Sequence, residues 1–189
     1  MLQEEEPEIW AGSADEQSEL DSAVLVQGGR ERGLILHKLM EEVLTGETQV
    51  SEAAITERAA ELIRALGKVP VADPAAGLSA RELADCVVRT LALPEITALR
   101  PELLAEFPVF ALRGEGSELV ATAGIADALT IGIEGRPVVV VDWKSDVNPE
   151  AKTLDHYRAQ VRAYLDMTGA ERGLIVLMTS GTAIPVLRP

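Results

Sequence analysis

Apolar residues recur every three or four positions along the first half of the chain, which is the spacing of an amphipathic helix. Residues 30–44 follow this pattern and are predicted to form one helix. Two further stretches of the same kind, 51–67 and 79–93, each begin with a serine, which is a preferred N-cap residue. We expect each serine to cap its helix, so the first half of the chain is predicted to be helical.

Glycine and proline divide the second half into shorter segments rich in β-branched residues. Segments 107–112, 119–129 and 138–143 are predicted to form a meander of three strands. Residues 155–168 return to helical spacing, and 173–179 form another apolar strand. Because a strand, a helix and a further strand imply parallel pairing, we expect an α/β fold with a mixed sheet flanked by helices.

Charge is distributed unevenly along the chain. The net charge is −14, and residues 1–29 contain eight acidic residues and no Lys or Arg. The remaining 23 acidic and 17 basic residues leave a charge of only −6 on the rest. We therefore predict an acidic, mobile tail over 1–24 and a single domain over 25–189. The acidic balance argues against a strong nonspecific grip on nucleic acid, which depends on Lys and Arg.

Neither a membrane segment nor a cysteine-based cluster is indicated by the sequence. The longest apolar runs, 137–141 and 173–178, are far shorter than the roughly 20 residues of a membrane-spanning helix. The start, MLQEEEPEIW, is acidic where a signal peptide would be basic. Cys86 is the single cysteine, so an iron–sulfur cluster held by four cysteines of this chain is excluded. We expect a cytoplasmic protein without a membrane partner.

The stretch VVVVDWKSD, residues 138–146, joins a buried strand to charged residues. Side chains alternate along a strand, so Asp142 and Lys144 point to one side and Trp143 to the other. Ligands bind preferentially at strand ends in α/β sheets. The pair is therefore either a ligand-binding site or a strand-end ion pair of little energetic value.

A further acid, Asp127, lies in the neighbouring strand segment GIADAL. If this segment pairs with the strand of Asp142, the two carboxylates converge and offer oxygen ligands suited to Mg²⁺ or Mn²⁺. Beside such a cation and a phosphate, Lys144 can orient water and offset developing negative charge. Glu106, in AEFPVF, is either a further carboxylate of this site or a solvated charge at the strand edge.

The helix after Lys144 carries polar side chains at helical spacing. Tyr157, Gln160 and Tyr164 share one face, where they either serve the site or pack the helix onto the sheet. Arg158 and Arg162 lie one turn apart on the adjacent face. They either meet phosphates or form a solvated helix face.

A histidine also lies on the first predicted helix, within GLILHKLMEE. His37 and Glu41 are four residues apart, so the glutamate can hold the imidazole ring. A lone histidine on an apolar helix is more often structural than a metal ligand.

Five short motifs occur in a fixed order along about residues 32–179: RGLILH, EFPV, GIAD, VVVVDWK and Y-x-x-Q-x-x-x-Y. In this order and in these strand and helix contexts, the chain resembles the RecB-type nuclease domain of the PD-(D/E)XK superfamily. It is most similar to the C-terminal nuclease domain of AddA-type helicase-nucleases. The resemblance implies a restriction-endonuclease-like fold and divalent-metal hydrolysis of DNA phosphodiesters.

The resemblance also implies roles for individual residues. Three side chains and one backbone carbonyl would bind the metal: His37, Asp127, Asp142 and Trp143. Lys144 would be the catalytic lysine, acting together with the two aspartates. Gln160 and Tyr164 would lie beside DNA or the lysine, and Tyr157 and Glu106 would support the site.

One feature of such helicase-nucleases is missing from this sequence. No G-x-x-x-x-G-K-[ST] phosphate loop occurs in it, so we expect a free-standing nuclease or a helicase partner on another chain. The predicted activity is an Mg²⁺- or Mn²⁺-dependent exonuclease acting on DNA ends in break repair. The alternatives are a non-catalytic scaffold that docks a helicase partner through its acidic tail, and a structure-specific or RNA nuclease.

Overall fold

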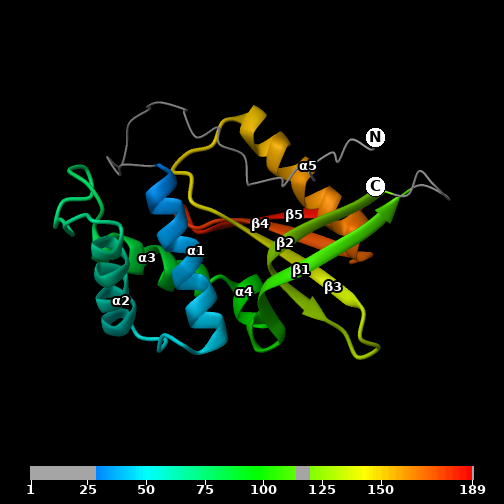
Figure 1. The fold of residues 1–189 in the computed structure, drawn as a ribbon, viewed down its shortest axis with the longest axis horizontal. Helices are drawn as coiled ribbons and strands as arrows, with labels where there is room; N and C mark the ends of the chain where they lie inside the picture. The colour runs from blue at the N-terminus through cyan, green and yellow to red at the C-terminus, as the bar shows by residue number, and fades with distance from the viewer. Residues whose placement is uncertain (1–28, 114–119, 189) are drawn as a thin grey trace, which may run out of the picture.

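The chain folds around a five-stranded sheet in the order β1-β2-β3-β4-β5 (Figure 1). This computed structural model describes residues 29–113 and 120–188. The strands are β1 (Leu103–Arg113), β2 (Val120–Ile131), β3 (Pro137–Lys144), β4 (Arg172–Leu177) and β5 (Thr182–Leu187). All neighbouring strands are antiparallel except β3 and β4, which are parallel. The predicted α/β class with a mixed sheet is confirmed.

The four longer helices occur where the sequence periodicity predicts them, and two short helical segments between them are not predicted. The helices are α1 (Arg30–Thr45), α2 (Glu52–Ala65), α3 (Ala80–Leu91), α4 (Pro94–Leu99), the short 3₁₀ helix η1 (Arg100–Glu102) and α5 (Ala151–Thr168). The Ser51 hydroxyl oxygen caps α2 by accepting a hydrogen bond from the Ala54 N–H. Ser79 precedes α3 but its side chain makes no such bond, so the expected cap there is wrong. Its hydroxyl instead lies 3.5 Å from the Ala72 carbonyl oxygen.

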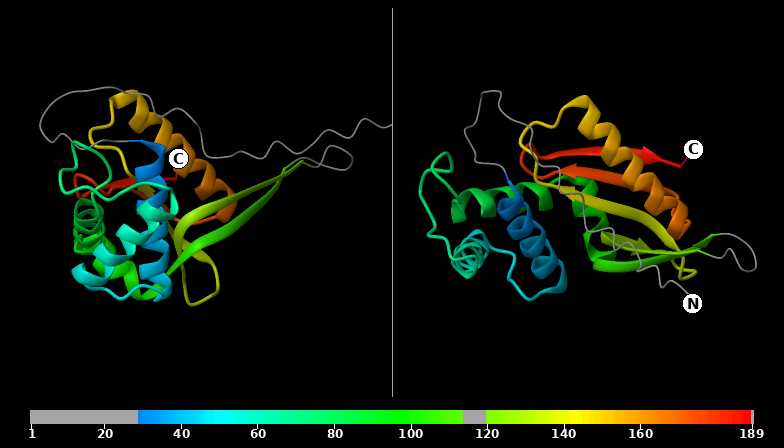
Figure 2. Two further views of the ribbon diagram at one scale, coloured as in Figure 1. Left: turned by 60° about the vertical axis from the view of Figure 1, so that its left-hand side comes forward. Right: turned by 45° about the horizontal axis from the view of Figure 1, so that its top comes forward.

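Helices cover both faces of the sheet (Figure 2). The α5 helix connects β3 to β4 and packs on one face, where Val161 and Leu165 share a buried cluster with Val140. The α1 helix, together with α2 and α3, covers the other face, where Val139 and Val141 belong to a second cluster. Successive valines of β3 thus point into two cores, which confirms that this strand is buried on both faces.

The β1–β2 hairpin reaches well beyond the rest of the sheet (Figure 2, left). Its pairing runs from Leu103, opposite Thr130, out to Arg113, opposite Val120. By contrast, β2 pairs with β3 only from Ala128 onward. The sheet therefore splits between β2 and β3, and the split begins next to Asp127.

Three elements, α4, η1 and β5, are not predicted by the sequence pattern. In β5, Pro185 lies opposite Leu174 of β4. Proline lacks a backbone donor and lowers the strand signal, but an edge strand tolerates it because one side of the strand has no ladder to complete.

Some expectations fall on parts of the chain that the structure does not describe. The predicted tail over 1–24 and the hairpin turn around residues 114–119 lie outside the described residues. Within the described ranges, no helix is both long and apolar enough to cross a membrane.

Candidate active site

Asp127 lies at the point where β2 leaves β3. The last β2–β3 pair on this side joins Ala128 to Val141. One residue further, Asp127 Oδ2 accepts a hydrogen bond of 2.7 Å from the Trp143 backbone N–H. A side-chain oxygen thus replaces a strand partner, and it fixes Asp127 beside the segment that carries Asp142 and Lys144.

His37 reaches Asp127 from α1. Its Nδ1 lies 3.2 Å from Asp127 Oδ1, and its side chain is one-third exposed. Burial alone would lower the pKa of His37, but the charge and hydrogen bond of Asp127 outweigh it and raise this pKa. Burial acts against the Asp127 carboxylate too, yet His37 and Lys144 hold the pKa of Asp127 below its usual value. The two groups therefore stabilise each other in their charged forms.

Glu106 completes a three-residue group. One nitrogen or oxygen atom from each of His37, Glu106 and Asp127 lies within 4.8 Å of the others. Burial, followed by the charges of Asp127 and Glu41, raises the pKa of Glu106. Imidazole and carboxylate ligands suit Mn²⁺, and carboxylates suit Mg²⁺. The chemistry of this group therefore fits a divalent cation.

Glu106 has a backbone conformation that is unusual for a residue other than glycine, with φ of 49°. Leu103, before Glu106, packs in the cluster beneath α1, whereas Val109, after it, packs in the cluster beneath α5. Exposure still alternates regularly along β1, with the odd-numbered positions 103–109 facing inward, so the strand passes from one cluster to the other near Glu106. Such backbone strain occurs preferentially at functional sites.

Asp142 is joined to Lys144 rather than to the group of His37. Its Oδ2 lies 3.1 Å from Lys144 Nζ, but this buried oxygen forms no hydrogen bond with any described residue. Burial, with a contribution from Asp127, raises the pKa of Asp142 to about 7 against the opposing effect of Lys144. The surrounding protein stabilises this buried carboxylate poorly as an anion. It is therefore suited to bind a cation.

Gln160 and Tyr157 approach Lys144 from α5. Lys144 Nζ donates a hydrogen bond of 2.9 Å to Gln160 Oε1. The same ammonium lies 4.5 Å from the centre of the Tyr157 ring. The helix face predicted from the Y-x-x-Q spacing is thus turned toward the lysine. Trp143 points away, into the core beneath α1, as the alternation predicts.

Two other candidate residues make contacts that the motifs do not indicate. Tyr164 donates a hydrogen bond of 3.0 Å to the Ile125 carbonyl, so it ties α5 to the β1–β2 hairpin close to Asp127. Glu41 accepts a hydrogen bond of 3.0 Å from Lys38. The expected hold of Glu41 on the His37 ring is therefore not found.

The two arginines considered for DNA contact lie on the outer side of α5. Arg158 donates a hydrogen bond of 2.9 Å to Asp155 on the same helix. Arg162 is exposed. Their surface position is compatible with phosphate contact, and that role remains a prediction.

Arg32, the first residue of the RGLILH motif but one to which the motif gives no role, anchors the segment that follows Lys144. Its side chain is only 2% exposed and donates hydrogen bonds to the Ser145 carbonyl and to Glu82 and Thr179. Arg32 lies four residues before Leu36, within the apolar stripe of α1. An arginine at such a position is the one local feature of the sequence that indicates a buried arginine. Arg32 joins α1 and α3 to the end of β3.

Comparison with known proteins identifies the family. The model of the PD-(D/E)XK nuclease superfamily matches residues 14–178. No curated protein matches the chain. A solved structure described as "Crystal structure of SSO0001" is similar over 82% of this chain and 77% of its own, with 16% sequence identity and a TM-score of 0.41. On the family match, which spans most of its length, the chain belongs to the PD-(D/E)XK nuclease superfamily.

Proposed function

We propose that this protein is a divalent-metal-dependent DNA exonuclease of the RecB type, similar to the nuclease domain of AddA-type helicase-nucleases. It would act on DNA ends during double-strand break repair, as a single cytoplasmic nuclease domain over residues 25–189. Superfamily membership supports a metal-dependent nuclease. The observation that carries the proposal is the grouping of His37 with Asp127 and of Asp142 with Lys144 at the split between β2 and β3.

His37, Asp127 and Asp142 would hold the cation, with the Trp143 carbonyl and Glu106 as further ligands. When bound, Mg²⁺ or Mn²⁺ would polarise the phosphodiester and lower the pKa of the attacking water. The roles proposed for the other side chains follow from their contacts.

Lys144 would donate an N–H to a phosphate oxygen and orient the water. An ammonium has three N–H donors, and Gln160 accepts one of them. With the Tyr157 ring on one side, the lysine tip is directed by α5 before substrate arrives. This preorganisation supports catalysis, because the enzyme then need not reorient the charge during reaction.

The alternative function is a non-catalytic scaffold that docks a helicase partner. A scaffold has no need to bury Asp142, which is 3% exposed, beside Lys144. Burying such charges costs stability, and groups whose pKa values are perturbed by burial and a charge partner cluster at functional sites. The site therefore favours catalysis.

The test is cleavage by the purified protein with Mg²⁺ or Mn²⁺. Linear duplex DNA should be degraded from its ends, and covalently closed circular DNA should remain intact. Asp142→Ala should abolish the activity, whereas Glu134→Ala, on the exposed β2–β3 turn, should keep it. Equal degradation by the Asp142 variant and the parent would exclude this site. Cleavage of closed circles or of RNA at equal rates would exclude the exonuclease and DNA assignments.

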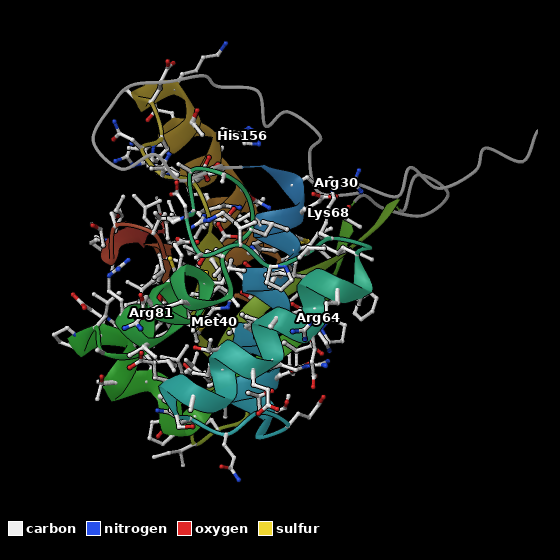
Figure 3. The ribbon with its side chains drawn as sticks, turned by 90° about the vertical axis from the view of Figure 1, so that its left-hand side faces the viewer. Arg30, Met40, Arg64, Lys68, Arg81 and His156 are labelled. Carbon is white, nitrogen blue, oxygen red and sulfur yellow. The ribbon has the colours of Figure 1, made fainter. Side chains whose placement is uncertain are left out.

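We also propose that a helicase subunit on another chain delivers the DNA. The face formed by α1, α2 and α3 carries Arg30, Arg64, Lys68 and Arg81 (Figure 3). Lys68 lies 3.4 Å from Glu31 and Arg81 lies 3.5 Å from Glu52, so acidic partners offset part of this charge. With a net charge of −14, the chain alone should bind duplex DNA weakly in a fluorescence anisotropy titration with Ca²⁺. Tight binding by the chain alone would contradict this proposal.

A further inference from the structure

The Lys144 ammonium is held on three sides by protein groups. Asp142 Oδ2 lies 3.1 Å away, Gln160 Oε1 accepts a hydrogen bond of 2.9 Å, and the Tyr157 ring centre is 4.5 Å distant. A lysine tip sits on a flexible four-carbon stem, so its place depends on such contacts. The position of the Tyr157 ring therefore helps to decide where the charge lies.

Tyr157 is itself fixed by Asp146. Its hydroxyl donates a hydrogen bond of 2.6 Å to Asp146 Oδ2, a short bond typical of a charged acceptor. A phenol that donates to a carboxylate gains electron density on its ring, which strengthens the attraction between the ring face and a cation. Asp146 thus acts on both the orientation and the electrostatics of the surface that Lys144 contacts.

The backbone just before Asp146 is anchored by hydrogen bonds to the Ser145 carbonyl. The Ser145 carbonyl accepts hydrogen bonds from Arg32 and from the Thr179 hydroxyl. Ser145 is also buried, so the backbone that carries Asp146 has a defined path after β3. Asp146 is therefore a fixed support for the Tyr157 hydroxyl.

We propose that Asp146 is a positioning residue for Lys144: by accepting the Tyr157 hydroxyl hydrogen bond, it keeps the Tyr157 ring against the ammonium and the ammonium beside Asp142 and Gln160. The catalytic consequence rests on the proposed function, because that function gives Lys144 its role. The positioning itself does not.

The position of Lys144 can be measured without any reaction. In protein labelled with ¹³C at lysine Cε, the Lys144 methylene signal should be shifted upfield by the Tyr157 ring, and Lys144→Arg identifies it by loss. Asp146→Ala and Tyr157→Phe should each move this signal toward those of exposed lysines. Asp146→Asn, which keeps an acceptor oxygen, should retain most of the shift. Asp166→Asn, on the exposed part of α5, is the matched control and should leave it unchanged.

The kinetic consequence should appear in turnover alone. Asp146→Ala and Tyr157→Phe should each lower kcat by about tenfold to a hundredfold, the scale of a misplaced reacting group. KM and the Mn²⁺ dissociation constant should stay within about twofold, because neither residue binds the substrate or the cation. The double variant should be no slower than either single variant, since the two residues act through one hydrogen bond.

Several results would overturn the proposal. An unchanged Lys144 signal in Asp146→Ala and Tyr157→Phe would show that Asp146 does not set the lysine position. Additive losses of kcat in the double variant, or an equal loss of kcat in Asp166→Asn, would also overturn the proposal. Tyr157→Phe removes only the hydroxyl group that donates to Asp146, so it decides the matter if Asp146→Ala fails to fold. If the parent does not cleave DNA, the proposed function fails, and the Lys144 signal still tests the positioning.

Discussion

The carboxylate of Asp127 accepts a hydrogen bond of 2.7 Å from the Trp143 N–H, and through its other oxygen it contacts His37 at 3.2 Å. A single side chain therefore joins β2 to β3 and both strands to α1. Regular β2–β3 pairing stops at Ala128, so Asp127 holds the sheet together where it begins to split. The same residue has a structural contact and a predicted metal-binding role, and the two can be separated by substitution.

Asp127→Asn and Asp127→Ala should differ in stability but not in metal binding. Both remove the negative charge, so both should weaken Mn²⁺ binding at least about tenfold, which corresponds to 1.4 kcal/mol. Only alanine leaves the buried Trp143 N–H without an acceptor, which should cost about 1–3 kcal/mol of unfolding free energy. Calorimetric Mn²⁺ titration and urea unfolding in EDTA measure the two effects. Equal stability of the two variants would contradict the structural contact.

Lys144→Ala should separate catalysis from metal binding. An ammonium is not a metal ligand, so the variant should bind Mn²⁺ as tightly as the parent. Its cleavage rate should fall by about a hundredfold or more, because a positioned charge and proton donor are lost. Single-turnover cleavage and calorimetry on the same preparation provide the comparison. A fall in Mn²⁺ affinity that matches the fall in rate would mean that Lys144 supports the ligands rather than the reaction.

The parts of the fold that depend on local pattern could be predicted from the sequence. The helix containing His37 and the strand ending at Lys144 follow from periodicity, because neighbouring side chains alone decide them. The strand–helix–strand order correctly implies parallel pairing of β3 and β4. Residues on these elements, including Gln160, could therefore be assigned to the right face.

The parts of the structure that depend on contacts between residues distant in the sequence could not be predicted. The hydrogen bonds of Arg32 link it to residues 50 and 113 positions away, and no local pattern encodes them. The strained backbone of Glu106 has no signal either, since glutamate is not expected in the left-handed region. The link from Tyr157 to Asp146 joins a helix to the turn before it, and motif spacing indicates only the tyrosine.

Arg32→Met should destabilise the protein strongly. The change leaves the Glu82 carboxylate, which is 16% exposed, without its 2.6 Å partner and leaves the Ser145 carbonyl with one donor fewer. Loss of one member of a buried ion pair costs about 3–5 kcal/mol. Urea unfolding should show this loss, whereas Arg64→Met, on the exposed side of α2, should change stability by less than about 0.5 kcal/mol. Similar effects of the two variants would mean that the Arg32 contacts contribute little.

Glu106→Gly should be more stable than Glu106→Ala. Both variants lose the carboxylate, but alanine keeps the strain of a φ of 49° and glycine relieves it. Glycine normally weakens a strand by about 1 kcal/mol, but the relief of strain exceeds this cost. We therefore expect a net difference of about 1 kcal/mol in favour of glycine. Thermal or urea unfolding of the two variants gives the sign directly. A less stable glycine variant would show that the Glu106 conformation is not strained.

The Glu42–Arg58 pair should make the stability depend on pH. Glu42 is 3% exposed and accepts two hydrogen bonds of 2.8 Å from Arg58 and one of 2.8 Å from Thr48. The Arg58 hydrogen bonds, supported by Thr48 and opposed by burial, hold the pKa of Glu42 below its usual value. The folded state therefore gains stability from the carboxylate above its unfolded pKa of about 4.3, and this gain is lost as the pH falls through the lower folded pKa.

Glu42→Gln should remove this pH dependence because it cannot ionise. At pH 7 the variant should be about 1–3 kcal/mol less stable than the parent, and the gap should narrow as the pH is lowered from about 5 toward 3. Glu57→Gln, an exposed position on α2, is the matched control and should follow the parent at every pH. Urea unfolding across this range measures the gap. A gap that stays constant down to pH 3 would mean that Glu42 keeps the same pKa in the folded and unfolded chains, and that the Arg58 contact acts by packing alone.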